Sequence, residues 1–245
     1  MSTPDPIRAA MATDVGRVRE HNEDAVLVTP RVVAVADGMG GHAAGEVAAA
    51  LAVESLRPLG DDDAVQTDDV VARVGAANQA LLDSAAAHPE QRGMATTLVG
   101  LAQVVVDGAP RWVAVNIGDS RIYRVVDGTM TQVSQDHSEV GELVAMGLLS
   151  EEDALRHPAR NIVTRCLGRD PLEPVDSWVL APHPGERFLL CSDGLTNELR
   201  DPAIARLLMD GDDPQVIADR LVAAAVEAGG RDNVTVVVVL GGTDR

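Results

Sequence analysis

The order of strand-like and helix-like segments constrains this fold more than any other feature of the sequence. Asp-Gly pairs at Asp107 and Asp127 join β-branched runs directly to one another, as in tight hairpins. Two long helical patterns instead follow one another between the second and third strands, so strands and helices do not alternate as in a parallel sheet. The expected strands are Ala25–Thr29, Arg31–Ala36, Thr97–Val106, Arg111–Ile117, Arg121–Val126, Thr129–Val133, Arg187–Cys191 and Val234–Leu240.

Antiparallel sheets covered by helices explain this order, so we expect an α+β fold, a layered sandwich in one domain. Because the chain has only two Trp, one Tyr and one Phe, its core must be built from Val, Leu, Ile and Ala. The expected helices are Ala43–Leu56, Asp68–Ala87, Ser138–Met146, Ser150–Arg156, Pro202–Met209 and Pro214–Ala228.

Charge and cysteine content exclude several classes of protein. The formal net charge of −18 and the scarcity of aromatic side chains weigh against a nucleic-acid-binding surface. Cys166 and Cys191 lack the spacing of a zinc site or a disulfide framework. Residues 1–8 lack the apolar stretch of a signal peptide, and no run of 18 apolar residues occurs, so we expect a cytoplasmic protein without membrane insertion.

Several expected strands have a carboxylate at or near one end. An ionised carboxylate at the tip of a buried strand costs several kcal/mol unless a cation or a donor compensates it. Clustered carboxylates suit hard cations such as Mg²⁺ or Mn²⁺. The alternative is that each residue caps a separate turn or helix, which is as common for any single aspartate. The residues are Glu23, Asp24, Asp37, Asp119, Asp193 and Asp232.

Six short motifs, in order along the chain, carry a resemblance to a known family. They are Arg19–Asp24, Ala36–His42, Gly93–Thr97, Ile117–Arg121, Cys191–Leu195 and Asp232–Thr235. From about Met11 to Leu240 the chain resembles the metal-dependent serine/threonine protein phosphatases of type 2C, the PPM family, in their bacterial single-domain form. The resemblance implies a four-layer α-β-β-α sandwich, with a central antiparallel β-sandwich flanked by antiparallel helix pairs. It also implies an N-terminal tail at 1–7, a catalytic domain at 8–241 and a flap at about 145–161.

The resemblance assigns roles to the carboxylates at a centre of two Mn²⁺ or Mg²⁺ ions, with a third ion in bacterial members. Asp37 would bridge the two ions, and Glu23 and Asp24 would act through metal-bound waters or hydrogen bonds. The remaining implied ligands are the Gly38 carbonyl, Asp193, Asp232 and, at the third ion with Asp193, Asp119.

Two divalent ions can acidify a bridging water and hold it in line with phosphorus, so the expected catalytic residues are Asp37, Asp193, Asp232 and Arg19. The planar guanidinium of Arg19 suits substrate phosphate binding, although a surface pairing with Glu20 or Glu23 is the plainer alternative. Met39 occupies the position of a histidine proposed as the general acid in some relatives. His42 would then be an acid, a hydrogen-bond partner behind the ligands or a helix-start residue.

The expected activity is hydrolysis of phosphoserine and phosphothreonine on proteins. The chain would act as a monomer on phosphorylated proteins and oppose a serine/threonine kinase. Two alternatives stay open: a catalytically silent module that binds phosphoproteins, and a phosphoesterase for small molecules. Loss of metal ligands is usual in silent relatives of enzymes, whereas Asp37, Asp193 and Asp232 are all present here.

Overall fold

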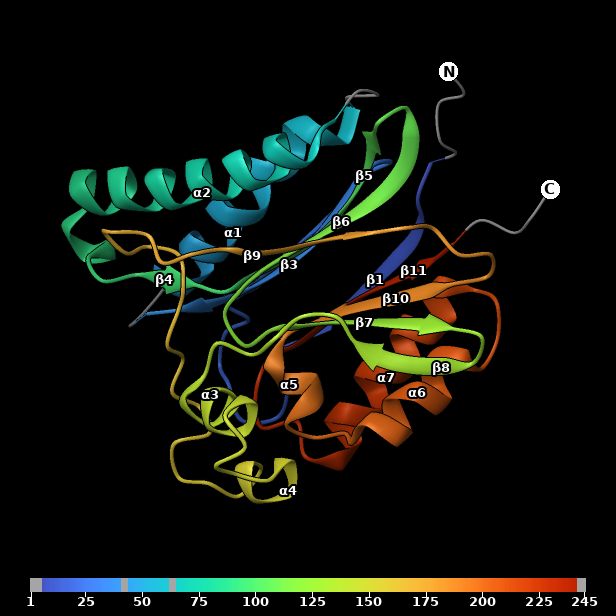
Figure 1. Cartoon of the computed structure of the whole chain (residues 1–245). Helices are drawn as coiled ribbons and strands as arrows, with labels where there is room; N and C mark the ends of the chain where they lie inside the picture. The colour runs from blue at the N-terminus through green and yellow to red at the C-terminus, as the bar shows by residue number, and fades with distance from the viewer. Residues whose placement is uncertain (1–5, 41–43, 62–64, 242–245) are drawn as a thin grey trace.

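The computed structural model describes residues 6–40, 44–61 and 65–241, in which two antiparallel sheets lie face to face between two layers of helices (Figure 1). One sheet has the order β1 (Arg8–Asp14), β11 (Val234–Leu240), β10 (Arg187–Cys191), β7 (Arg121–Val126) and β8 (Thr129–Gln132). The other has the order β2 (Asp24–Val28), β3 (Val32–Met39), β5 (Leu98–Val106), β6 (Ala109–Ile117) and β9 (Asp176–Leu180), with β4 (Ala95–Thr96) paired to β3.

The long helices form the two outer layers, with α1 and α2 on one side and α6 and α7 on the other (Figure 1). Three short helices lie in the loops at one end of the sandwich. The bounds are α1 (Ala44–Leu56), α2 (Thr67–Ala87), α3 (Glu139–Ala145), α4 (Glu151–Ala154), α5 (Asp193–Thr196), α6 (Asp201–Met209) and α7 (Pro214–Ala228), with 3-10 turns at η1 (Arg57–Asp61) and η2 (Pro89–Gln91).

Three separate hydrophobic cores fill the spaces between the four layers. Along β3, Ala34 and Ala36 pack toward α1 and α2, while Val33 and Val35 pack against the other sheet, as the period of two in a strand requires. The core between the sheets contains the only ring pair found among the described residues, Trp112 and Phe188, with centroids 5.3 Å apart. The prediction of a four-layer sandwich with an aliphatic core is therefore confirmed.

Each expected strand and helix has a counterpart in the structure, and the two predicted hairpin turns are confirmed by the positive φ angles of Asp107 (52°) and Asp127 (49°). Four elements were not predicted: β1, β4, β9 and α5. β1 is rich in alanine, which has low strand propensity, but every one of its residues lies in register with β11 from Arg8↔Leu240 to Asp14↔Val234. Tertiary pairing therefore overrides the local preference of this segment.

Two sequence predictions fall at the limits of the described residues: the N-terminal tail and the role of His42 at a helix start. Ile7, the last residue of the expected tail, donates its amide to the Pro30 carbonyl at 2.8 Å. His42 lies outside the described residues. None of the described helices combines the length and the apolar character that a membrane crossing requires.

Candidate active site

A cavity of about 280 Å³ opens at the end of the sandwich where the carboxylate-bearing strands meet. Six of the seven residues expected to hold metal contribute to its wall. Three further residues line it: Arg19 between β1 and β2, Met39 at the end of β3, and Asn161 between α4 and β9. The six are Glu23, Asp37, Gly38, Asp119, Asp193 and Asp232.

Asp24 is the exception, since it does not line the cavity. It pairs with Asp37 across β2 and β3, and its carboxylate accepts a hydrogen bond from Ser192 at 2.8 Å. Successive residues of an extended chain point to opposite sides, so when Glu23 faces the cavity Asp24 turns away from it. Asp24 therefore lies outside the cavity, and it interacts with the acidic cluster through Coulomb repulsion from Asp193 and Asp232.

Thr97 joins the two parts of the chain that supply Asp37 and Asp119. Its hydroxyl accepts the backbone N–H of Asp37 at 3.0 Å and lies 2.8 Å from the hydroxyl of Ser120, next to Asp119. Thr96 adds a bond from its own hydroxyl to the Asp37 carbonyl at 2.9 Å. The sequence indicates only that both threonines begin a strand near the third-ion region, so this specific link is a finding of the structure.

Asn233 fixes the loop between β1 and β2 to the start of β11, a role that sequence analysis missed. Its side-chain oxygen accepts the Glu23 N–H at 2.9 Å, and its amide nitrogen donates to the carbonyls of Val15 and His21, both at 2.9 Å. A buried amide that satisfies three backbone groups fixes their mutual positions. The position of Asn233 directly after Asp232 was the sequence signal that could have identified it.

Gly38 allows the backbone to approach two other segments closely. A Cβ atom at this position would lie 2.1 Å from the Gly45 carbonyl oxygen and 2.6 Å from that of Glu23. Any side chain would push α1 and the Glu23 loop away from β3. The sequence Asp37-Gly38 thus reflects a packing requirement as well as a ligand position.

The acidic side chains share a strongly unfavourable electrostatic environment. Burial raises the pKa of Asp37 well above its ordinary value, and repulsion from Asp24 and Asp193 raises it further. Burial and then repulsion from Asp232 raise the pKa of Asp193 to about 6, although hydrogen bonds from Asn197 and Asp37 oppose the shift. Asp37 and Asp193 therefore line the same cavity and interact electrostatically across it.

The pKa of two further members is also raised, mainly by burial. That of Asp24 reaches about 7, with hydrogen bonds from Thr235 and Ser192 opposing the rise, and that of Asp119 lies well above its ordinary value because burial is joined by repulsion from Asp193. Carboxylates placed this closely cannot all ionise unless positive charge joins them. Arg19 supplies one such charge, through an ion pair with Asp232 at 2.7 Å that replaces the surface pairing with Glu20 or Glu23.

The residues of the cavity fit divalent metal ions. Their donors are carboxylate and carbonyl oxygens, and one oxygen of Asp193 is buried without a hydrogen-bond partner. Among the residues described, no three acidic, histidine or cysteine side chains converge closely enough to hold an ion as they stand. The reason lies in their present partners: Arg19 holds Asp232, and Asn197 donates to Asp193 at 2.9 Å. Ion binding therefore requires these carboxylates to turn toward one another.

Comparisons with known proteins identify relatives of this chain. A family model for protein phosphatase 2C matches residues 17–214, which ends before Asp232 and β11. Serine/threonine protein phosphatase PstP of Mycobacterium tuberculosis is 40% identical over 238 residues, which cover 95% of this chain and 44% of that protein. The chain thus spans less than half the length of PstP. Serine/threonine phosphatase stp of Listeria welshimeri is 36% identical over 244 residues, with 95% of both chains covered.

A solved structure carries the same arrangement of layers. It is the catalytic domain of serine/threonine protein phosphatase PstP in complex with two manganese ions, with a TM-score of 0.86, 37% identity and coverage of 98% of this chain and 99% of that one. The layered fold, the cavity of strand-end carboxylates and these matches lead to one conclusion: the chain belongs to the protein phosphatase 2C family.

Proposed function

We propose that this chain is a metal-dependent protein phosphatase that hydrolyses phosphoserine and phosphothreonine. The observation that carries the proposal is the meeting of Asp37 and Asp193 in a cavity that also contains Arg19. The names of the relatives support the substrate class, since PstP and stp are serine/threonine phosphatases. Manganese or magnesium is the proposed metal, because the donors are oxygens and a related catalytic domain holds two manganese ions.

Each carboxylate receives a role from its position in the cavity. Asp37, at the end of β3, lies between the two sheets' loops and is proposed to bridge two ions, with the Gly38 carbonyl on one of them. Asp193 and Asp232 would complete the other, and Asp119 would share a third ion with Asp193. Bound divalent ions would supply Lewis acidity and an activated water for attack on phosphorus.

Arg19 is proposed to bind the substrate phosphate. Its side chain is exposed at the rim, and one terminal nitrogen donates to Asp232. Within the described part of the chain, the other guanidinium nitrogens make no hydrogen bond, so they can donate to phosphoryl oxygens. A donor pair in a fixed plane favours the charge that builds on those oxygens during transfer.

Met39 cannot donate a proton to the leaving alkoxide, so a water molecule in the cavity is proposed to do so. Proteins phosphorylated on serine or threonine are the proposed partners, with a kinase of matching specificity acting in opposition. A monomer in the cytoplasm is the proposed state, and the segment at 145–161 is proposed to act as the flap over the site.

Phosphate release from a phosphothreonine peptide tests the proposal. Activity should require Mn²⁺ or Mg²⁺ and stop when a chelator is added, and activity that survives chelation would reject the mechanism. Asp193→Ala should lose most turnover and stay folded. Glu173→Gln, which removes an exposed carboxylate outside the cavity, serves as the matched control.

The same measurements separate the alternatives. Calorimetric binding of Mn²⁺ without any turnover would favour a silent phosphoprotein-binding module. Competition between a phosphopeptide and small phosphate esters would identify a small-molecule phosphoesterase, if the esters were preferred.

A further inference from the structure

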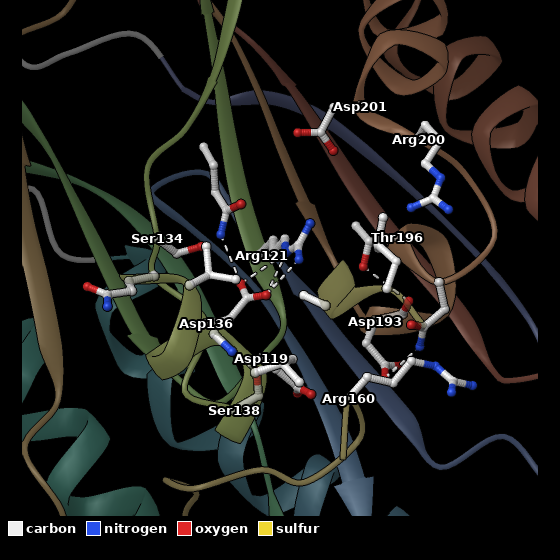
Figure 2. A pocket seen from close by; sticks show the side chains of 18 of the residues that line it. Asp119, Arg121, Ser134, Asp136, Ser138, Arg160, Asp193, Thr196, Arg200 and Asp201 are labelled. Carbon is white, nitrogen blue, oxygen red and sulfur yellow. Dashed lines mark hydrogen bonds and ion pairs between the residues drawn. The ribbon is translucent and has the colours of Figure 1, made fainter. Parts of the chain in front are cut away.

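A second cavity, of about 530 Å³, adjoins the acidic one and shares Asp119 and Asp193 as walls (Figure 2). It lies between the flap, helix α3 and the start of α6. Of the residues that line this cavity, only Asp119 and Asp193 have a role in the proposed metal chemistry. Most of the cavity therefore has no assigned role. Its volume exceeds that of the acidic cavity, where phosphate is proposed to bind.

The lining combines apolar surface with three arginines. Val140, Val144, Leu155 and Leu199 form much of the apolar part. Four aspartates, Asp119, Asp136, Asp193 and Asp201, line it as well. The apolar wall accommodates the methylene stem of a side chain, and an arginine without a partner inside the protein selects a negative charge at its tip.

Arg121 is fully engaged within the protein and is not available to a ligand. Its guanidinium donates to both oxygens of Asp136, at 2.6–3.0 Å, and to the Tyr123 hydroxyl at 2.9 Å. Tyr123 in turn donates to Asp201 at 3.0 Å. This network makes a rigid base for the cavity, with its positive charge already neutralised.

Arg160 and Arg200 differ, since neither makes a side-chain hydrogen bond or ion pair within the described ranges. Both are exposed, Arg160 on the flap and Arg200 before α6. Figure 2 shows them as lining residues with Asp193 and Thr196 between them in that view. Their guanidinium donors are therefore available to a ligand in this cavity.

Helix stability does not explain Arg200. It occupies the N-cap of α6 without a capping bond, where serine, threonine, asparagine and aspartate are favoured. Its positive charge is also repelled by the positive end of the helix dipole. The negative charge of Asp201, in the first turn, is by contrast attracted to that end. An arginine at a position where it costs stability points to a ligand of opposite charge.

We propose that this second cavity binds an anionic side chain of the phosphoprotein substrate, close to the phosphorylated residue, with Arg160 and Arg200 as its counter-charges. The inference rests on the proposed function. The shared chemistry is an anion on a flexible stem, supplied by a carboxylate or by a second phosphorylated residue. Arg160 and Arg200 are then specificity-determining residues for phosphate hydrolysis at the neighbouring site.

Paired phosphopeptides test the inference, with the full chain and Mn²⁺. Each peptide carries one phosphothreonine, and glutamate or glutamine is placed in turn at each of the neighbouring positions on both sides. At one position, kcat/KM should be about 2- to 5-fold higher for glutamate, the range expected for partly exposed charge pairs. In Arg200→Gln and Arg160→Gln this preference should fall toward one, whereas Arg200→Lys should keep most of it.

Three controls separate recognition from structural damage. Hydrolysis of p-nitrophenyl phosphate, which has no neighbouring side chain, should be unchanged in Arg200→Gln. Arg206→Gln removes an exposed arginine from the same helix outside the cavity and should retain the glutamate preference. The thermal midpoint of Arg200→Gln should not fall below that of the wild type.

The outcomes are distinct. A wild-type enzyme without any preference for glutamate, or a preference that survives both glutamine substitutions, overturns the inference and leaves the phosphatase proposal standing. A chain that hydrolyses neither p-nitrophenyl phosphate nor any peptide with Mn²⁺ overturns both. Where the preference is found, a peptide with a second phosphothreonine at that position identifies the anion: higher kcat/KM than glutamate assigns the cavity to doubly phosphorylated segments, and lower kcat/KM assigns it to carboxylates.

Discussion

Replacing Asp193 with asparagine should stabilise the metal-free protein and abolish most of its activity. The folded structure raises the pKa of Asp193 from 3.8 to about 6, through burial first and repulsion from Asp232 second. Each unit of pKa corresponds to about 1.4 kcal/mol, so ionising this carboxyl in the fold costs about 3 kcal/mol. Solvent that reaches the cavity screens part of this cost, which leaves a gain of about 1–3 kcal/mol for the variant.

Asparagine preserves the packing that this comparison needs. It has the shape of aspartate, and its oxygen can still accept from Asn197. For a chain of this length, each kcal/mol moves the thermal midpoint by about 2–4 °C, so the variant should unfold about 2–12 °C higher in chelator at pH 8.

The pH dependence gives the charge-specific signature. A carboxyl with a raised folded pKa favours folding below its unfolded pKa and loses that contribution as pH rises through the folded value, here between about 4 and 6. The wild-type midpoint without metal should therefore fall as pH rises, and the gap to Asp193→Asn should be widest above pH 7 and narrow toward pH 5. If the variant were more stable only because asparagine relieved a steric clash, the gap between the two midpoints would not change with pH.

Differential scanning calorimetry in chelator and in Mn²⁺ measures both effects. Mn²⁺ at about 1,000 times its dissociation constant should stabilise the wild type by about 4.1 kcal/mol and the variant by much less, so their order should reverse. Glu173→Gln controls for the loss of one negative charge. A metal-free variant no more stable than the wild type at pH 8 would refute the assigned repulsion.

Three further substitutions probe other parts of the structure. Arg19→Lys keeps the charge and loses the planar fork, so KM for a phosphopeptide should rise about 10-fold, and unchanged steady-state kinetics would argue against phosphate binding. Gly118 has φ of 118° and its Cβ would lie 2.5 Å from that of Thr97, so Gly118→Ala should lower the free energy of unfolding by about 2–4 kcal/mol in urea titrations and reduce turnover. Glu186, 2% exposed, accepts from Trp112 at 2.7 Å, and Glu186→Ala should cost about 3–5 kcal/mol without changing kcat/KM at temperatures where it is folded.

Sequence patterns predicted most of the fold because hairpins and amphipathic helices depend on neighbouring residues. The segment after each Asp-Gly pair, a strand or a helix, distinguishes the turns at Asp107 and Asp127 from Asp37 and Asp193. β1 escaped prediction because its alanines favour strands weakly, and β9 because it is a short strand of five residues. Their partners β11 and β6, which are distant in the sequence, supply the hydrogen bonds.

The carboxylates at the strand ends show where prediction from the sequence stopped. Placement of Asp37 and Asp193 at the tips of buried strands was visible, and the family motifs assigned them to metal. Their contact was not visible, because they lie on opposite sheets and meet only through the packing of the two sheets. The sequence also could not tell that Asp24 turns toward Ser192.

The amino-acid sequence by itself determined the order of strands and helices, the aliphatic character of the core and the chemical type of the site. Tertiary structure alone decided which carboxylates share a cavity, which arginines lack partners and where Arg160 and Arg200 border a second cavity. The physical reason is range: propensity and periodicity act between residues a few positions apart, whereas sheet register and layer packing determine distances between charges far apart in the chain.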